Sequence, residues 1–102
     1  MDEEDISGDV AVKRKIDVKR PSKYKVILHN DDYTTMEFVV QVLVQIFQKN
    51  QEEAIKIMHD VHKSGSGIAG IYSKEIAETK VNITMQNAQE AGYPLLCTME
   101  KE

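Results

Sequence analysis

The sequence predicts one α/β (α+β) domain, a two-layer sandwich with three helices on one face of a three-stranded sheet, in the order β-α-α-β-α-β. Three short apolar runs, bounded by turn-forming residues, have the length expected of strands. Three longer stretches have helical periodicity, and each is preceded by a short polar capping residue. A chain of 102 residues, of which 41% are hydrophobic, is sufficient for one core and therefore for one domain.

The first predicted strand and the first predicted helix are joined by a corner rich in acidic residues. Residues 23–29 alternate between apolar and lysine side chains over most of their length, as expected of a half-buried strand. Over about 36–48, helical spacing places five apolar residues on one broad face: Val39, Val40, Leu43, Val44 and Phe47. Thr34 and Glu37 have the spacing of a capping box, so we expect Thr34 to be the N-cap of this helix.

The second half of the chain supplies the remaining elements. Asn50 predicts the start of a second helix, and Gly65 predicts its end because glycine readily adopts the left-handed conformation. Residues 68–72 are expected to form a short strand, and residues 95–99 the last one. Between them, Ser73 is expected to cap a third helix. The apolar face of that helix is formed by Ala77, Val81, Met85 and Ala88.

Composition and charge argue against several classes of function. The net charge is −4, and residues 23–102 hold eleven acidic and eight basic side chains, which argues against nucleic acid as a partner. No apolar run approaches the ~20 residues that span a bilayer, so we expect no membrane association. The chain begins with acidic residues rather than a secretory signal, and its single cysteine, Cys97, permits no internal disulfide. We therefore expect a cytoplasmic protein, and no feature of the sequence indicates anything but a monomer.

Residues 1–22 are predicted to be a flexible N-terminal extension, and residues 23–102 the folded domain. The extension has an acidic half followed by a basic half, with six acidic and five basic side chains and no aromatic residue. Such a segment buries too little apolar surface to fold alone, so it is either a plain extension or a segment that a partner holds.

The clearest functional feature is the corner after the first strand, where Asn30, Asp31 and Asp32 follow one another. Asn and Asp side chains form hydrogen bonds with the local backbone and therefore favour a break in regular structure. A turn can use one of the two carboxylates, but it does not need both of them together with the Asn30 amide. The surplus of acceptors is the main indication of a ligand site in this sequence, with a purely structural turn as the alternative.

Catalytic roles receive less support from the residues. Adjacent carboxylates rarely face one another, and no second acidic segment is placed opposite them for paired acid–base work. His59 and His62 could bind zinc only if the acidic corner supplied two further ligands. Cys97 lies within a predicted strand, where a small buried residue is more common than a nucleophile. With no phosphate-binding glycine loop and no Ser-His-Asp arrangement in the sequence, we expect no enzyme, no metal and no cofactor.

Four separate blocks of the sequence resemble one known family, the Clp protease adaptor ClpS. The blocks are residues 26–39, Met58 with Val61, His62 and Gly65, residues 75–81 and residues 94–100, in the order of the family. Together they cover about 23–102, and the combination is far more specific than any one block. The resemblance implies a non-catalytic adaptor that binds proteins with a bulky hydrophobic N-terminal residue (Leu, Phe, Tyr or Trp), called an N-degron. It further implies delivery to a Clp-family AAA+ ATPase, ClpA or a relative, for degradation by ClpP.

The resemblance also implies which residues form the site. A free α-amino group is a cation with three N–H donors, so its receptor needs converging acceptors. By resemblance these are Asn30, Asp31 or Asp32, and a neutral ring nitrogen of His62. The apolar pocket for the N-terminal side chain is implied at Thr34, Met36, Val39, Met58, Val61 and Leu95. Met36 corresponds to the gate that disfavours β-branched residues.

Partner contacts follow from the same resemblance. Glu75 and Lys80 match positions that dock on the N-terminal domain of the ATPase, of ClpA or ClpC type, and the ATPase would engage residues 1–22 during delivery. The family usually has proline at the position of Thr35, so we expect a slightly looser corner here. Two alternatives stay open: a metal-dependent hydrolase that uses the corner with the two helix histidines, and a scaffold that docks on the ATPase without holding substrates. The sequence leaves open the partner ATPase, the ranking of the four N-terminal residues, and a bacterial or plastid-stroma setting.

Overall fold

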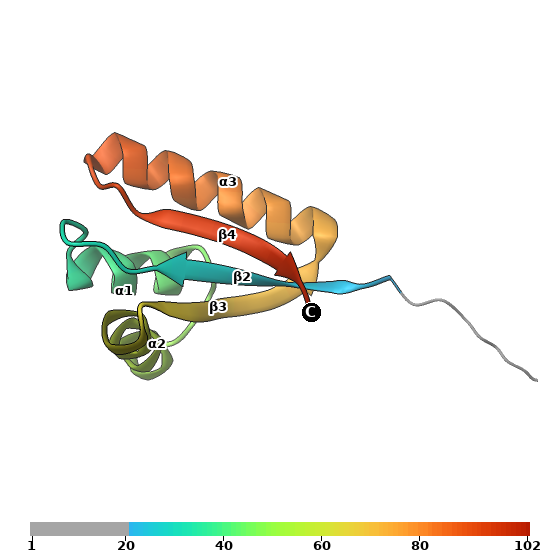
Figure 1. The fold of residues 1–102 in the computed structure, drawn as a ribbon, viewed down its shortest axis with the longest axis horizontal. Coiled ribbons are helices and arrows are strands. Elements are labelled where there is room, and N and C mark those ends of the chain that lie inside the picture. Colours follow the sequence, from blue (N-terminus) through green and yellow to red (C-terminus); the bar gives the residue numbers. More distant parts are fainter. Residues whose placement is uncertain (1–20) are drawn as a thin grey trace, which may run out of the picture.

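The computed structural model describes residues 21–102 and confirms the predicted fold class (Figure 1). Its elements are β2 (Lys23–His29), α1 (Met36–Gln45), α2 (Gln51–Ser64), β3 (Ser66–Ser73), α3 (Lys74–Ala91) and β4 (Leu96–Lys101). β2 is the central strand of the sheet, in the order β3-β2-β4, and it pairs antiparallel with both neighbours. The predicted flexible extension lies outside the described residues, apart from its last two positions.

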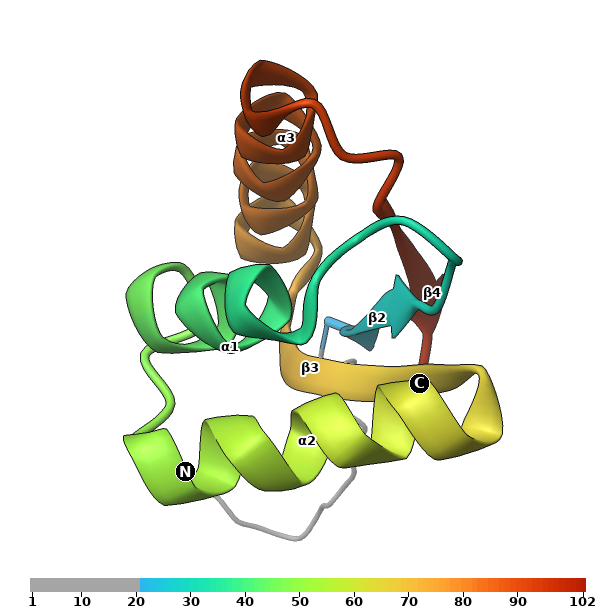
Figure 2. The same ribbon diagram turned by 90° about the vertical axis from the view of Figure 1, so that its left-hand side faces the viewer.

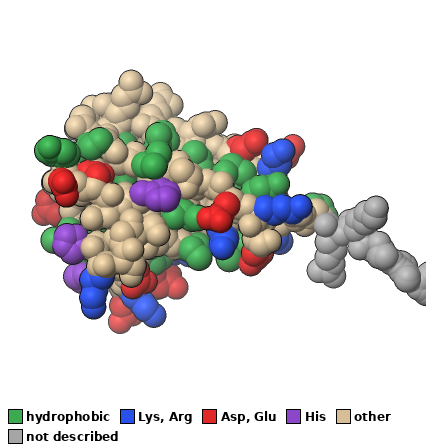
Figure 3. All heavy atoms as spheres, viewed as in Figure 1, with side chains coloured by type: hydrophobic (Ala, Val, Ile, Leu, Met, Phe, Trp, Pro, Cys, Tyr) green, Lys and Arg blue, Asp and Glu red, His purple; other side chains and the backbone are tan. Residues whose placement is uncertain are grey.

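The helices cover one face of the sheet, and the core lies between the two layers (Figure 2). Alternation along β2 buries Val26 and Leu28 completely, whereas Lys25, Ile27 and His29 lie on the opposite face and are only partly buried. α3 packs across all three strands, while α2 packs against β3 and α1. The open face of the sheet is turned toward the viewer in Figure 3, where hydrophobic side chains are interspersed with charges of both signs.

The start of α1 corrects one prediction, because Thr35 rather than Thr34 is its N-cap. The Thr35 side chain accepts a hydrogen bond from the Phe38 amide at 3.1 Å. Thr34 instead donates its backbone N–H and its hydroxyl to Asp31, which holds it in the loop and delays the helix by one residue. The φ of −74° at Thr35 is one that proline also adopts. Thr35 therefore stabilises this corner through a capping hydrogen bond. A proline at this position could not form that bond, because its side chain has no acceptor.

The end of α1 also differs from the prediction, because the helix ends at Gln45 and not near residue 48. The carbonyl oxygen of Ile46 accepts a hydrogen bond from Lys80 Nζ at 2.5 Å, which satisfies one of the free carbonyls at the helix end. The chain then reverses through Gln48, which has a positive φ of 53°. Phe47 is buried as expected, but it belongs to this turn and not to the helix.

The other helix boundaries are confirmed. Asn50 accepts a hydrogen bond from the Glu53 amide at 2.8 Å, and Ser73 accepts one from the Ile76 amide at 3.4 Å. Gly65 ends α2 in the left-handed conformation, with φ of 91°. These three boundaries depend only on groups within a few residues of one another, which is why the sequence pattern was sufficient to predict them.

The second and third strands are longer than predicted, and the buried face of α3 is slightly rotated. β3 covers Ser66–Ser73 and β4 covers Leu96–Lys101, so Leu95 precedes the last strand. On α3, the predicted Ala77 and Ala88 are buried and Val81 is half-buried, but Thr84 takes the fully buried position expected for Met85. Met85 is instead exposed, and its sulfur accepts a hydrogen bond from the Cys97 amide at 3.3 Å.

Candidate functional site

The loop between β2 and α1 is organised by the carboxylate of Asp31. Its Oδ1 atom accepts hydrogen bonds from the backbone N–H groups of Tyr33 and Thr34, each at 2.7 Å. Its Oδ2 atom accepts a hydrogen bond from the Thr34 hydroxyl at 2.6 Å. Burial alone would raise the pKa of Asp31, but these three hydrogen bonds stabilise the charged form and leave the pKa below its ordinary value of 3.8. Asp31 is therefore a negatively charged group that holds the loop in shape.

The same loop is attached to the C-terminal end of α2. The backbone N–H of Asn30 donates to the carbonyl oxygen of Gly65 at 2.9 Å, and the N–H of Gly65 donates to the carbonyl oxygen of Val61 at 3.0 Å. Figure 2 shows the loop and this end of α2 at the same end of the molecule. This backbone connection places His62 of the last turn of α2 next to the acidic corner, although the two are far apart in the sequence.

The loop and the two helices enclose one hollow of about 380 Å³, which we call the corner pocket. Nine of the ten residues proposed for substrate binding line it: Asn30, Asp31, Asp32, Thr34, Met36, Val39, Met58, Val61 and His62. Leu95 is not part of this lining; it belongs to the buried core, with 3% of its surface exposed. Tyr33 and Thr35 also line it, and only their place between the predicted residues could have indicated this.

One end of the corner pocket is polar and carries negative charge. Asn30, Asp32 and His62 are exposed, and their side chains form no hydrogen bond with another residue of the described range 21–102. Asp31 and Asp32 line the corner pocket, whereas no lysine or arginine does. Groups of this kind can accept hydrogen bonds from a small cation, and the negative charge nearby favours one.

The wall of the corner pocket is apolar and includes one exposed, flexible side chain, that of Met36. Val39, Met58 and Val61 belong to the buried core, so their pocket-facing atoms are held by the packing behind them. Met36 differs, because 48% of its surface is exposed at the first turn of α1. A methionine side chain has three rotatable bonds and a polarisable sulfur, so it can adapt its position to the group that enters.

The described residues offer little for catalysis. Within residues 21–102, no three His, Cys, Asp or Glu side chains lie close enough together to hold a metal ion. Burial raises the pKa of the Cys97 thiol to about 12, so the reactive thiolate is scarcely populated at neutral pH.

Within residues 21–102, no helix is both long enough and apolar enough to cross a membrane.

Glu75 and Lys80 lie on α3, around a second hollow of about 360 Å³ that also touches the end of α1. Glu75 is exposed in the first turn of α3. Lys80 is half-buried: besides its bond to Ile46, it donates to the Gln48 side chain at 3.1 Å and lies 5.2 Å from the centre of the Tyr72 ring. Lys80 therefore has a structural role at the end of α1, which the sequence did not reveal.

The fold and the corner pocket together define a small α/β binding domain, built around a loop that presents acceptors next to an apolar wall. The family model for the ATP-dependent Clp protease adaptor protein ClpS matches residues 19–98 of this chain. The chain thus belongs to the ClpS family. Members of this family are named as adaptors of a protease and not as enzymes, in agreement with the prediction from the sequence.

Individual relatives agree with this placement. The ClpS adapter protein of Lawsonia intracellularis is 52% identical over 99 residues, which is 97% of this chain and 89% of the relative. That of Clostridium acetobutylicum is 53% identical over 93 residues, 91% of this chain and 92% of the relative. A solved structure of Agrobacterium tumefaciens ClpS2 bound to L-phenylalaninamide superposes with a TM-score of 0.79 at 41% identity, over 81% of this chain and all of that one.

Proposed function

We propose that this protein binds the first residue of N-degron substrates in the corner pocket and delivers them to a Clp AAA+ ATPase for degradation by ClpP. The observation that carries this proposal is that free hydrogen-bond acceptors and an apolar wall line the same hollow of about 380 Å³. A protein that begins with Leu, Phe, Tyr or Trp has a cationic α-amino group and a bulky apolar side chain on adjacent atoms. L-Phenylalaninamide, the ligand of the Agrobacterium structure, has both of these groups.

The roles within the corner pocket divide between its polar end and its apolar wall. Asn30, Asp32 and a neutral His62 accept hydrogen bonds from the three N–H donors of the α-amino group. Asp31 holds the loop and adds negative charge, and three of its roughly four acceptor sites are already used within the loop. Thr34 serves the same loop by its hydrogen bonds to Asp31.

The apolar side chain of the first residue packs on the wall formed by Val39, Met58 and Val61. Met36 acts as the gate, because it is the exposed member of the lining and can move with little disturbance of the core. Leu95 supports the wall from behind, since it belongs to the same buried cluster without reaching the corner pocket.

The direct test of the proposal is a titration with labelled peptides that begin with Phe or Leu. We expect dissociation constants in the micromolar range or lower, which corresponds to a binding free energy of about −8 kcal/mol or more negative. Failure of both peptides to bind would leave the alternative of a scaffold that docks on the ATPase without holding substrates.

Binding should weaken on acidification, through protonation of His62. A neutral imidazole can accept a hydrogen bond from the ammonium group of the peptide. A protonated imidazole has two N–H donors and no acceptor, and its positive charge would repel that ammonium group. The affinity for a Phe peptide should therefore be lower at acidic pH than at neutral pH. The measurement is fluorescence anisotropy between pH 7.5 and pH 5.5, with His62→Gln as the control that keeps an acceptor without titrating. An unchanged affinity of the wild type across this range would remove His62 from the acceptor role.

The proposed docking surface for the ATPase N-terminal domain, of ClpA or ClpC type, is the second hollow, on α3. Exposed Ile76 and Ile83 lie there beside Glu75, which gives this surface the mixture of apolar area and charge that partner contacts use. The two relatives described above are from bacteria, and we propose the bacterial cytoplasm as the compartment.

Glu75→Lys should weaken binding to the ATPase N-terminal domain by tenfold or more, because it reverses a charge within that contact. Peptide affinity and thermal stability should not change, since the Glu75 side chain is exposed and does not line the corner pocket. Calorimetric titration with the isolated N-terminal domains of ClpA and of ClpC measures this and also identifies the partner. Lys80 is a poor choice for the same experiment, because its substitution would remove the contact with the end of α1. Full ATPase affinity in Glu75→Lys would contradict this placement.

A further inference from the structure

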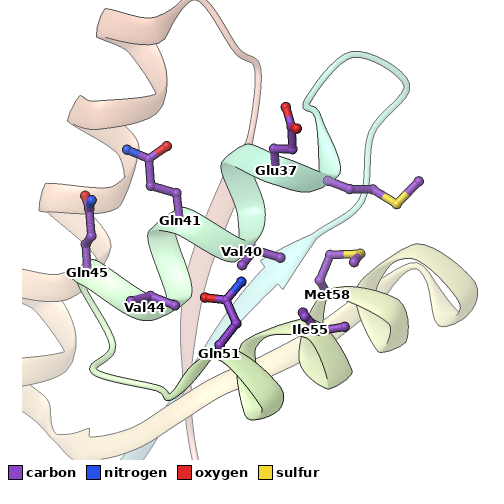
Figure 4. A pocket seen from close by; sticks show the side chains of 9 residues that line it. Glu37, Val40, Gln41, Val44, Gln45, Gln51, Ile55 and Met58 are labelled. Carbon is purple, nitrogen blue, oxygen red and sulfur yellow. The ribbon is translucent and has the colours of Figure 1, made fainter.

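A third and larger hollow lies between α1 and α2, next to the corner pocket. We call it the α1–α2 groove; its volume is about 680 Å³, which is within the range of pockets that bind ligands. Figure 4 shows Val40 and Val44 pointing from α1 toward α2, while Gln51, Ile55 and Met58 point back toward α1. Its outer edge along α1 is polar and is formed by Glu37, Gln41 and Gln45.

The α1–α2 groove is continuous with the corner pocket, because Met36 and Met58 line both of them. Along α2, residues 62, 58, 55 and 51 succeed one another on one face, from the polar end of the corner pocket to the far end of the groove. These eleven steps along a helix span about 16 Å, the length of about five residues of extended peptide. The two hollows thus form one channel that is long enough for the beginning of a polypeptide chain.

We propose that the α1–α2 groove binds the segment that follows the N-terminal residue of a substrate, and that it takes an apolar side chain from the second, third or fourth position. This inference rests on the proposed function, because the first residue must occupy the corner pocket for the following ones to reach the groove. It adds a second site of selection, since substrates with the same first residue would differ in affinity according to the residues behind it.

The chemistry of the lining fits such a segment. The floor is aliphatic, and Ile55 keeps 39% of its surface exposed on a helix that is otherwise polar on its outer side. Glu37 is the one charged residue of the lining, so a neutral apolar side chain suits the groove better than a charged one. The Gln51 side chain points between the helices and offers both a donor and an acceptor to a peptide backbone. A ligand of one residue, such as phenylalaninamide, would leave all of these groups unused.

The test compares three kinds of ligand on the full chain: phenylalaninamide, Phe-Ser-Ser-Ser-amide, and the same peptide with leucine at position 2, 3 or 4. We expect leucine at one of these positions to increase the affinity about tenfold over serine, the lower end of what burial of one leucine supplies. Ile55→Lys should abolish that gain without changing the affinity for phenylalaninamide. Ile71→Lys is the matched control, because this isoleucine is similarly exposed at 44% on β3 and lines none of the three hollows, so its substitution should preserve the gain.

Two results would overturn the inference alone. The first is the absence of any gain from leucine at all three positions, and the second is a gain that persists undiminished in Ile55→Lys, with normal binding of phenylalaninamide in both cases. A wild-type protein that does not bind phenylalaninamide would instead contradict the proposed function itself, and the inference with it. Circular dichroism of both lysine variants establishes that they are folded.

Discussion

Acetylation of the α-amino group should reduce the affinity of a peptide that begins with Phe more than about 100-fold. The free amine is a cation with three N–H donors, whereas the acetylated nitrogen is neutral and keeps one donor. It would therefore leave acceptors of Asn30, Asp32 and His62 unpaired in the corner pocket and lose the attraction of the two carboxylates. The added acetyl group would also occupy space at the polar end, where the loop is attached to α2 through the Asn30 amide.

The measurement is a titration of labelled Phe and Leu peptides, each beside its acetylated form. A matched protein control is Asn30→Ala, which removes one acceptor and keeps the backbone N–H that donates to Gly65. We expect this variant to bind the free peptide about tenfold more weakly and to discriminate less between the two forms. Equal binding of free and acetylated peptides by the wild type would mean that the corner pocket recognises apolar side chains alone.

Asp31→Ala should have the second largest effect, because it removes three hydrogen bonds that shape the loop. Two backbone N–H groups and the Thr34 hydroxyl would lose their acceptor. Hydrogen bonds to a charged group contribute about 1.5–3 kcal/mol each when buried, and less in a partly exposed loop. We expect the free energy of unfolding to fall by about 2 kcal/mol, measured by urea denaturation, and the affinity for a Phe peptide to fall at least tenfold.

Asp32→Ala is the matched control for this prediction. Asp32 is exposed and forms no hydrogen bond within the described residues, so its loss should change the free energy of unfolding by less than about 0.5 kcal/mol. Its loss should still weaken peptide binding. If Asp31→Ala proved as stable as Asp32→Ala, the loop would not depend on the Asp31 carboxylate.

The pH dependence of stability gives the same prediction a second readout. The pKa of Asp31 is lower in the folded protein than its ordinary value of 3.8. Its contribution to stability is therefore fully present above that value and is lost as the pH falls below it toward the folded pKa. The difference in unfolding free energy between wild type and Asp31→Ala should shrink over this acidic range and should stay constant from pH 5 to 7.

Local signals in the sequence were sufficient for much of the fold. The caps at Asn50 and Ser73 and the left-handed glycine at position 65 each depend on hydrogen bonds within a few residues, so the pattern predicted them correctly. The same holds for the surplus of acceptors at Asn30 to Asp32, where one carboxylate is used by the loop and the other remains free. The resemblance to the ClpS family then supplied the function, which local chemistry alone left open.

Tertiary contacts decided the rest, because they join residues that no local pattern connects. α1 ends where Lys80, thirty-four residues away, satisfies the Ile46 carbonyl, and the corner pocket exists because the Asn30 amide bonds to Gly65 at the end of α2. Leu95 has the same apolar character whether it lines a pocket or backs its wall, so only packing could place it. The α1–α2 groove likewise arises from the fit of two helix faces. By itself the sequence determined the elements and the chemistry of the site, while the enclosure of that chemistry depended on long-range packing.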